Sequence, residues 1–294
     1  MAYSASHGQL EHLPENFEPR HRNRARWVES ARDPLPAEQR HSTWPSIAKR
    51  LRGPRPYPSW LIEDAAAIDT TLGLLKTGKE GEVYLLQRAT ATRSVLLAAK
   101  RYRAAEHRQF NRSQSYSEGR SVRRSRDMRA LKTSSSYGRE VAALQWASAE
   151  FSFLVRCYRA GIPVPYPVQL DGTEILMEFI ADPERPSNAA PRLQQLPRGD
   201  RRLPDLWIQA LGLLEGFASE GIAHGDLSAY NLLISGERLV VIDVPQCVDL
   251  AGNINGFDYL YRDCENLCLW FTTKGLAQDP QIVFEGLLAL LFTG

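Results

Sequence analysis

Residues 222–246 read IAHGDLSAYNLLISGERLVVIDVPQ, and this stretch carries most of the information about the fold. Two short apolar runs, LLI and LVVI, flank a Ser-Gly-Glu turn, a pattern typical of a β-hairpin. A hairpin returns the chain to the end at which it began. Asn231, which enters the hairpin, and Asp243, which leaves it, are therefore expected to lie close together although they are twelve positions apart.

The residue types at these positions indicate metal and phosphate chemistry. An amide oxygen and a carboxylate are hard ligands suited to Mg²⁺. Asp226 stands five positions before Asn231, the H-x-D-x-x-x-x-N spacing of a kinase catalytic loop. An isolated Asp-Asn pair in a loop is usually a turn or a helix cap. Against that interpretation, a carboxylate that ends an apolar strand is costly unless it is solvated or coordinated. We expect Asp226 to accept the proton of an attacking hydroxyl and His224 to brace the loop.

A second stretch, GLLKTGKEGEVYLL at residues 73–86, comes close to a P-loop. A P-loop needs a serine or threonine after its lysine, to ligate Mg²⁺, and a helix whose N-terminal amides hold the phosphates. Here Glu80 follows Lys79, and the next residues have the pattern of a strand. The stretch is therefore interpreted as a glycine turn before a strand, with Lys79 placed to contact phosphate as in a kinase hairpin.

The strand SVLLAAKR, residues 94–101, brings Lys100 to the position of the phosphate-binding lysine in V-A-I-K. Such a lysine needs a carboxylate partner on a helix. Glu140 and Glu150 both lie in the helix predicted for residues 137–160, ten residues apart and so about 15 Å along its axis. Only one of them can pair with Lys100, and the pattern alone does not choose.

The order of elements predicts an α+β, bilobal, protein-kinase-like fold. Its N-terminal lobe combines an antiparallel sheet with one long helix, and its C-terminal lobe is small, truncated and helical. Nucleotide sites often lie between two such lobes. We expect a helical element at residues 59–70, a flexible, basic and Pro-rich tail at 1–56, an N-terminal lobe at 57–179 and a C-terminal lobe at 180–294.

The composition of the chain also bears on where in the cell the protein is expected. The chain of 294 residues is 43% hydrophobic, and no apolar run reaches the roughly 18 residues of a membrane span. The first 20 residues lack the apolar core of a signal peptide. We therefore expect a cytoplasmic protein without a membrane partner. The four cysteines form no C-x-x-C pair and are predicted to be small buried hydrophobes.

Residues 101–139 hold eleven Arg or Lys against three acids, and eight serines lie between Ser113 and Ser136. Such a composition favours a flexible inserted loop, at about residues 103–136. Basic clusters of this kind attract nucleic-acid phosphates without reading sequence, so the segment is a candidate for contact with the ribosome or its RNA.

Taken in order, these motifs resemble the RIO family of atypical serine/threonine protein kinases, in a bacterial-type form, over roughly residues 70–290. TGKEGEVY resembles the family's phosphate loop, AAKRY its lysine strand and MEFI its hinge. HGDLSAYNLLI and VIDVPQ resemble its catalytic and metal loops, and YLYRDCENLCLWF its Arg-Asp-Cys-x-Asn helix. WASAEFSFLVRCYRAGIPVPYPV resembles helix C and the turn after it, and this alignment favours Glu150 over Glu140.

The resemblance implies an ATP-dependent kinase that uses Mg²⁺ or Mn²⁺, with autophosphorylation in the Arg/Ser-rich loop. It also implies ATPase activity with phosphoryl transfer to the metal-binding aspartate, which is Asp243 here. Eukaryotic and archaeal members act in small-subunit ribosome maturation. The catalytic set it implies is Asp226, Lys100, Glu150, Asn231 and Asp243, with Asn231 and Asp243 as metal ligands. The nucleotide-binding set it implies is Thr77, Gly78, Lys79, Glu80, Gly81, Val83, Lys100, Met177 as gatekeeper, and the backbone of Glu178 and Ile180.

Two other functions remain open at this point. An aminoglycoside- or choline-type phosphotransferase shares H-G-D-x-x-x-x-N, and Gly225 is typical of that class. TGKEGE, DVPQ and the mere 51 residues after Asp243 argue against it. A nucleotide-gated RNA- or ribosome-binding scaffold would explain the basic loop, but the complete Lys-Glu-Asp-Asn-Asp set argues against a purely structural role.

Overall fold

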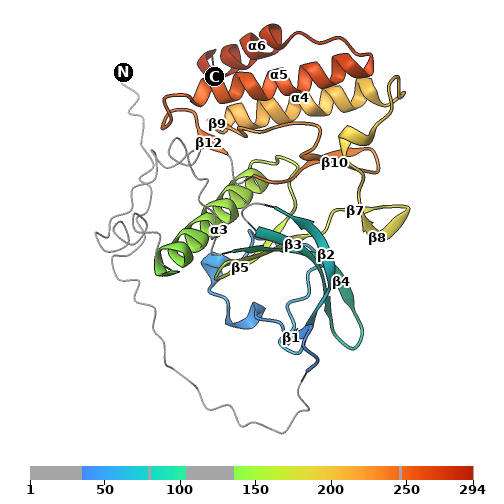
Figure 1. Cartoon of the computed structure of the whole chain (residues 1–294), viewed down its shortest axis with the longest axis vertical. Coiled ribbons are helices and arrows are strands. Elements are labelled where there is room, and N and C mark those ends of the chain that lie inside the picture. Colours follow the sequence, from blue (N-terminus) through green and yellow to red (C-terminus); the bar gives the residue numbers. More distant parts are fainter. Residues whose placement is uncertain (1–34, 79–80, 104–135, 245–246, 294) are drawn as a thin grey trace, which may run out of the picture. The chain divides into compact units, whose positions relative to one another are not determined.

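The computed structural model describes residues 35–78, 81–103, 136–244 and 247–293 (Figure 1). The described residues from Pro36 onward form one compact unit. Expectations for residues 1–34, for Lys79 and Glu80, and for residues 104–135 lie outside the described ranges. No described helix has the length and apolar character needed to cross a membrane.

The N-terminal lobe is built on a six-stranded antiparallel sheet in the order β1-β2-β3-β4-β6-β5. Alternation along β4 divides its side chains between two faces. Leu97 and Ala99 belong to one buried cluster and Tyr102 belongs to another. The strands are β1 (Gln39–His41), β2 (Ile68–Thr77), β3 (Gly81–Ala89), β4 (Ser94–Tyr102), β5 (Pro167–Asp171) and β6 (Glu174–Glu178).

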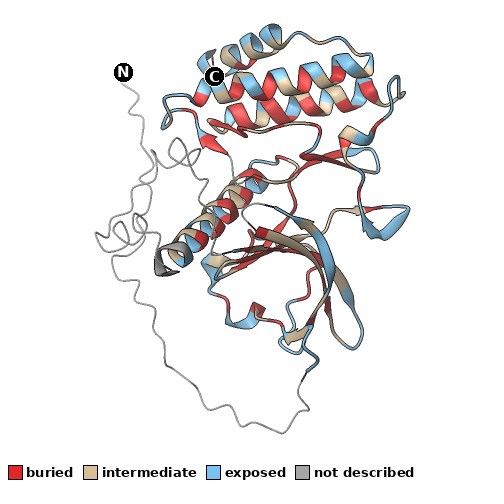
Figure 2. Cartoon of the chain, in the orientation of Figure 1, coloured by how far each residue is buried: buried red, intermediate tan, exposed pale blue. Residues whose placement is uncertain are grey.

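One long helix, α3 (Ser136–Arg159), packs beside β4, β5 and β6. Its buried residues recur every three or four positions, as expected for a helix with a single apolar stripe. Figure 2 shows this stripe as a buried band along the ribbon, with exposed residues on the opposite side. The buried residues on this stripe include Ala143, Ala147, Phe151 and Leu154.

The other face of the sheet is covered by residues 42–62, most of which the sequence assigned to a flexible tail. Trp44 is only 2% exposed and packs with Leu61 and Leu97 in the second buried cluster. This region contains the short 3-10 helices η1 (Trp44–Ser46) and η2 (Lys49–Leu51). From Pro36 onward the segment is therefore part of the folded lobe.

Specific long-range contacts explain why a basic, Pro-rich segment is ordered here. The Arg52 guanidinium donates to the Trp44 carbonyl at 2.8 Å and lies over the Trp44 ring, 4.8 Å from its centroid. The Gly53 N–H donates to the Val168 carbonyl of β5 at 2.9 Å. Composition indicates how flexible a segment is on its own, but it does not reveal contacts with distant residues such as Val168.

The helical element expected at residues 59–70 is also wrong. The chain runs without helix to Ile68 and then enters β2. Asp69 at the start of β2 is 1% exposed and pairs with the fully buried Arg88 of β3, with Oδ1 and Nε 2.7 Å apart. A buried carboxylate is costly without a partner, and Asp69 reaches Arg88 because the two residues lie on paired strands. This pairing favours a strand here, although the AAAI sequence has a helical pattern.

The C-terminal lobe consists mainly of three helices that pack on one another, with short hairpins at their base (Figure 1). The α+β prediction of a sheet-and-helix lobe followed by a helical lobe is confirmed. The boundary between residues 179 and 180 stays a prediction. All four cysteines are buried and free. The elements are β7 (Ala181–Asp182), β8 (Arg185–Ala189), η3 (Leu193–Gln195), α4 (Leu203–Ser219), β9 (Ile222–Ala223), β10 (Leu232–Ser235), β11 (Arg238–Val241), β12 (Val248–Asp249), α5 (Gly256–Lys274) and α6 (Pro280–Thr293).

Candidate active site

The hairpin β10–β11 brings Asn231 and Asp243 to one end, as the sequence predicts. Leu232 pairs with Val241, and the Ile242 N–H donates to the Asn231 carbonyl at 2.9 Å. The Asn231 side-chain amide donates to the Asp226 carbonyl at 2.9 Å. Within the described ranges no group donates to the Asn231 Oδ1 atom, so that oxygen remains available as a ligand.

Asp243 sits in a strained backbone conformation and carries two ion pairs. Its φ of 67° is the only positive value among the described non-glycine residues, and such outliers cluster at functional sites. The Asp243 Oδ1 atom lies 3.1 Å from Lys100 Nζ, and Oδ2 lies 2.9 Å from Lys76 Nζ. Burial alone would raise the pKa of the Asp243 carboxyl, but the two ammonium groups outweigh it and lower that pKa. Lys76 was not predicted from the sequence to belong to the site.

Lys100 of β4 is held between two carboxylates. Its Nζ atom lies 2.8 Å from Glu150 Oε1, and the Tyr102 hydroxyl donates to the other oxygen of Glu150. Burial would lower the pKa of the Lys100 ammonium, but Glu150 and Asp243 outweigh burial and raise it. Of the two candidate partners, the structure therefore places Glu150 against Lys100, while Glu140 is exposed on α3.

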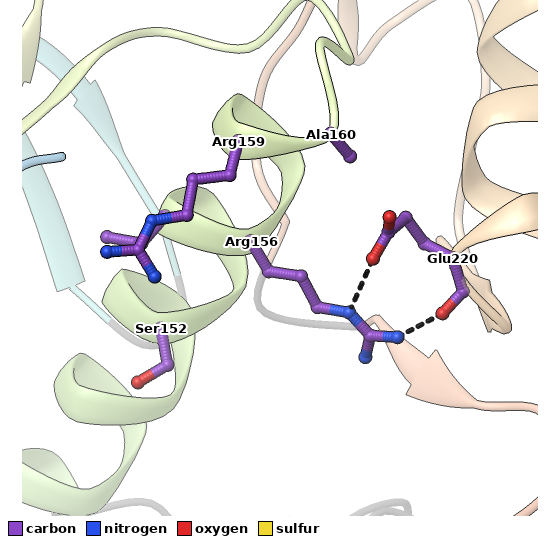
Figure 3. A pocket seen from close by; sticks show the side chains of 6 residues that line it. Ser152, Arg156, Arg159, Ala160 and Glu220 are labelled. Carbon is purple, nitrogen blue, oxygen red and sulfur yellow. Dashed lines mark hydrogen bonds and ion pairs between the residues drawn. The ribbon is translucent and has the colours of Figure 1, made fainter. Parts of the chain in front are cut away.

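Helix α3 is also fixed at its far end to the C-terminal lobe. The Arg156 Nε atom lies 3.0 Å from Glu220 Oε2, and the same guanidinium donates to the Glu220 carbonyl. Figure 3 shows this pair on the wall of an open hollow of about 330 Å³, which Ser152 and Arg159 also line. The Lys100–Glu150 pair joins α3 to β4, and the Arg156–Glu220 pair joins it to the end of α4, so the helix is held from both lobes.

Asp226 lies in the loop between β9 and β10, directly after a glycine in the left-handed region. Gly225 has a φ of 82°, a value that side chains rarely allow, which explains glycine at this position. Burial raises the pKa of the Asp226 carboxyl above its usual value. A general base works better as its pKa approaches the working pH, so this shift suits proton acceptance.

Asp263 of α5 is a second residue whose role the sequence did not reveal. It is 1% exposed, and its carboxylate accepts hydrogen bonds from the Gly225 N–H at 2.9 Å and the Leu227 N–H at 2.8 Å. Asn266, one turn along the same helix face, donates to the Leu227 carbonyl at 3.1 Å. These bonds fix the backbone on both sides of Asp226. In the sequence, the only indication of this role is the three-residue spacing of Asp263 and Asn266 within RDCEN, which places both side chains on one face of the helix.

The glycine turn joins β2 to β3, and the residues after it form a strand. The Gly78 N–H donates to the Gly81 carbonyl at 2.8 Å. A Cβ atom at Gly81 would lie 2.2 Å from the Arg101 carbonyl, so only glycine fits there. Because β3 begins at Gly81, the P-loop interpretation is excluded, as the sequence indicated. Thr77 is the last residue of β2. Val83 of β3 lies opposite Lys100 of β4, so the side chains of Val83 and Lys100 are on the same face of the sheet.

The hinge residues lie at the end of β6 and directly after it. Met177 pairs with Ala98 of β4. The Glu178 N–H donates to the Tyr166 carbonyl at 2.9 Å, and the Glu178 carboxylate accepts from the Tyr166 N–H at 3.0 Å. The Ile180 carbonyl accepts from the Ala190 N–H, whereas the Ile180 N–H has no acceptor among the described residues. That N–H is therefore free to meet a ligand.

The residues present suit a divalent cation that also binds phosphate. In the described part of the chain, no group of three or more His, Cys, Asp or Glu side chains could hold a metal alone. Asn231 and Asp243 would supply two hard oxygen ligands. Mg²⁺ commonly binds through one or two carboxylates plus substrate phosphates and water, so this set fits Mg²⁺ better than a metal that needs a complete protein cage.

His224 is fully buried beside this site, with its ring edge-on to Phe217 at 5.7 Å between centroids. Burial lowers the pKa of its imidazole from 6.5 to about 4, so the ring is neutral near pH 7. The bracing role of this ring stays a prediction.

The stability of the protein is expected to fall below pH 6.5 because of His224. Between pH 6.5 and about 4 the unfolded chain takes up a proton at this imidazole and the folded chain does not. The free energy of unfolding therefore decreases as pH falls, by about 3 kcal/mol in total. Denaturant unfolding of His224→Phe at pH 4.5 and pH 7 should show a smaller acid-dependent loss than the wild type. His41→Phe, at an exposed position, is the matched control and should behave as the wild type. An unchanged pH dependence in His224→Phe would contradict this assignment.

Comparison with known proteins gives the family. The RIO domain matches residues 82–282. The RIO-type serine/threonine-protein kinase Rio1 of Haloferax volcanii is 30% identical over 229 residues, covering 76% of this chain and 71% of that protein. Serine/threonine-protein kinase RIO3 of Bos taurus is 34% identical over 134 residues, 45% of this chain. The match spans only 25% of the length of that bovine relative.

Solved structures show the same fold. The Rio2 kinase of Chaetomium thermophilum, in an ADP/Mg²⁺-phosphoaspartate complex, has a TM-score of 0.52 at 19% identity, covering 76% of this chain and 66% of that one. Another structure of Rio2 kinase from this organism has a TM-score of 0.53 at 18% identity, covering 75% and 63%. Because the RIO domain matches more than half of the sequence, and the archaeal relative agrees with it over most of both chains, this protein belongs to the RIO family.

Proposed function

We propose that this protein is a RIO-type serine/threonine kinase that transfers the γ-phosphate of ATP to serine. The observation that carries the proposal is the meeting of Lys100 and Glu150 of the N-terminal lobe with Asp243 of the C-terminal lobe. The names of the archaeal and mammalian relatives, all serine/threonine-protein kinases, support the same class of reaction.

Each residue of this set has a distinct task. Lys100 supplies positive charge for the phosphates, and Glu150 holds its ammonium in place. Asn231 and Asp243 hold Mg²⁺ or Mn²⁺, which neutralises phosphate charge when bound. Asp226 orients the acceptor hydroxyl and takes its proton. Phosphoryl transfer depends mainly on positioning and charge, so a rigid arrangement of these groups is what the reaction requires.

The nucleotide would be held from both sides of the site. The Ile180 N–H and the backbone of Glu178 meet adenine beside Met177, and the β2–β3 turn covers the phosphates. Lys79, which we assign to phosphate contact, and its neighbour Glu80 lie outside the described residues, so that contact rests on their place in the turn.

Two acceptors are proposed. Serines between Ser113 and Ser136, almost all in the part of the chain that the structure does not describe, are tethered to the site and so have a high effective concentration. Asp243 is the second acceptor: its carboxylate takes the γ-phosphoryl group as ADP leaves, and hydrolysis of the resulting acyl phosphate by water gives net ATPase activity. The related Rio2 structure contains a phosphoaspartate, which supports this second route. A ribosome-related role through residues 101–139 rests on their charge alone.

Family membership favours a protein kinase over a small-molecule phosphotransferase. A nucleotide-gated scaffold would need ATP binding without transfer. Label transfer from γ-labelled ATP separates catalysis from scaffolding, because only an enzyme moves the phosphate.

Glu150→Gln tests the proposed arrangement with a matched control in the same helix. The neutral amide removes one of the two carboxylates that hold the Lys100 ammonium, and a misplacement of about 1 Å can cost 10²-fold in rate. We therefore expect autophosphorylation to fall by about 10²-fold. Glu140→Gln, at the exposed alternative position, should keep the wild-type rate. Equal losses in the two variants would contradict the assignment of Glu150. Absence of metal-dependent ATP binding by the wild type in calorimetry would overturn the proposed function itself.

A further inference from the structure

Lys76, which was not predicted from the sequence, contacts a carboxylate oxygen that the proposed metal ion would need as a ligand. Its Nζ atom lies 2.9 Å from Asp243 Oδ2, while Lys100 takes Oδ1 at 3.1 Å. Both oxygens of the proposed metal-binding carboxylate therefore carry an ammonium group. A cation that binds Asp243 meets a like charge on either side.

An irregularity in β2 places Lys76 there. Leu74 pairs with Tyr84 of β3, and the next pair joins Lys76 to Val83, with a register shift between them. Regular pairing would set Leu75 opposite Val83, and such a bulge re-aims the side chains that follow it. Val83 in turn pairs with Lys100. Lys76, Val83 and Lys100 thus form one row across three strands, on the face that looks toward Asp243.

The two lysines are not equivalent. The side chain of Lys100 is 10% exposed and has a second carboxylate partner in Glu150. The side chain of Lys76 is 40% exposed, and within the described ranges Asp243 is its only ion-pair partner. A half-exposed ion pair contributes little free energy, because water and salt screen it. Lys76 can therefore leave Asp243 more easily than Lys100 can.

Resting on the proposed role of Asp243 as a metal ligand, we propose that Lys76 is a place-holder for the divalent cation. Its ammonium neutralises Asp243 Oδ2 in the metal-free protein and is displaced when the cation binds. Metal binding is then an exchange of one positive charge for another. This exchange lowers the apparent affinity for the cation and keeps β2 joined to the C-terminal lobe until the cation arrives.

Direct binding of Mn²⁺ to the full chain tests this exchange without any measurement of activity. Free Mn²⁺ is followed by electron paramagnetic resonance in titrations without nucleotide. Lys76→Met keeps the length of the side chain and removes its charge. We expect it to bind Mn²⁺ about tenfold more tightly than the wild type, as removal of one nearby like charge predicts. Lys76→Arg keeps the positive charge and should bind Mn²⁺ with the wild-type affinity. Lys49→Met, at an exposed lysine elsewhere in the lobe, should also bind Mn²⁺ as the wild type does.

Asp243→Asn separates failure of the exchange from failure of the metal site. If Asp243→Asn loses Mn²⁺ binding while Lys76→Met binds as the wild type or more weakly, the exchange is wrong and the metal site stands. If Asp243→Asn binds Mn²⁺ as well as the wild type, the metal assignment itself is wrong. Failure of Lys76→Met to bind Mn²⁺ at millimolar concentrations would also overturn the exchange, because its empty Oδ2 should then be the better ligand.

Discussion

Replacement of Asp226 by asparagine is expected to lower phosphoryl transfer to serine by about 10²–10⁴-fold, the usual contribution of general acid–base catalysis. The amide keeps the size of the carboxylate but loses its charge and its capacity to accept a proton. Gly225 and Leu227 remain bonded to Asp263, so the loop should keep its shape. The expected loss is therefore chemical and not structural.

The affinity for Mg²⁺ and ATP should change little in the same variant. In the proposed mechanism Asp226 meets the acceptor hydroxyl and does not bind the metal, and the hydrogen bond from the Asn231 side chain to the Asp226 backbone carbonyl is kept in the variant. Incorporation of label from γ-labelled ATP measures transfer, and calorimetry measures binding. Asp258→Asn, on the exposed first turn of α5, is the control. Full transfer activity in Asp226→Asn would show that Asp226 is not the base.

Replacement of Asp243 by asparagine is expected to weaken both metal-dependent ATP binding and transfer. The neutral amide removes the anion that Lys100 and Lys76 share, and it is a weaker ligand for Mg²⁺ than a carboxylate. Loss of one preorganised electrostatic group typically reduces the rate by 10²–10³-fold, and we expect a loss of at least about 10²-fold here. Calorimetry with ATP, with and without Mg²⁺, measures the binding part. Unchanged ATP affinity in the presence of Mg²⁺ would contradict the metal assignment.

Asp226→Asn and Asp243→Asn are expected to differ in their effects on phosphoryl transfer and on ATP binding. Asp226→Asn should separate transfer from binding, whereas Asp243→Asn should reduce both. Equal profiles would mean that the two carboxylates do not have the distinct roles assigned to them.

Much of the site could be predicted because its parts are local in sequence. The hairpin between Asn231 and Asp243 follows from two apolar runs and a Ser-Gly turn. The strand that ends in Lys100 and the helix that holds Glu150 follow from residue patterns of period two and period 3.6. The pattern could not choose between Glu140 and Glu150, because that choice depends on how the helix lies against the sheet.

The remaining features depend on contacts between distant segments. Residues 36–56 have the composition of a flexible tail, yet Trp44 from this segment packs with Leu61 in a cluster against the sheet. The position of Lys76 depends on a strand irregularity that moves the pairing by one residue, and sequence patterns do not show register. Asp263 acts through backbone N–H groups 36 and 38 positions away, so only its motif could suggest its role.

The proposed kinase activity is tested most directly by incubating the purified full chain with γ-labelled ATP and Mg²⁺, with a parallel sample containing a chelator. The label is then followed on the protein and in released phosphate. The structure and the family predict Mg²⁺-dependent label on serine of the chain, with strong loss in Asp226→Asn. A wild-type protein that binds Mg²⁺ and ATP but moves no label, either to itself or to water, would contradict the proposed kinase and identify a nucleotide-gated binding protein instead.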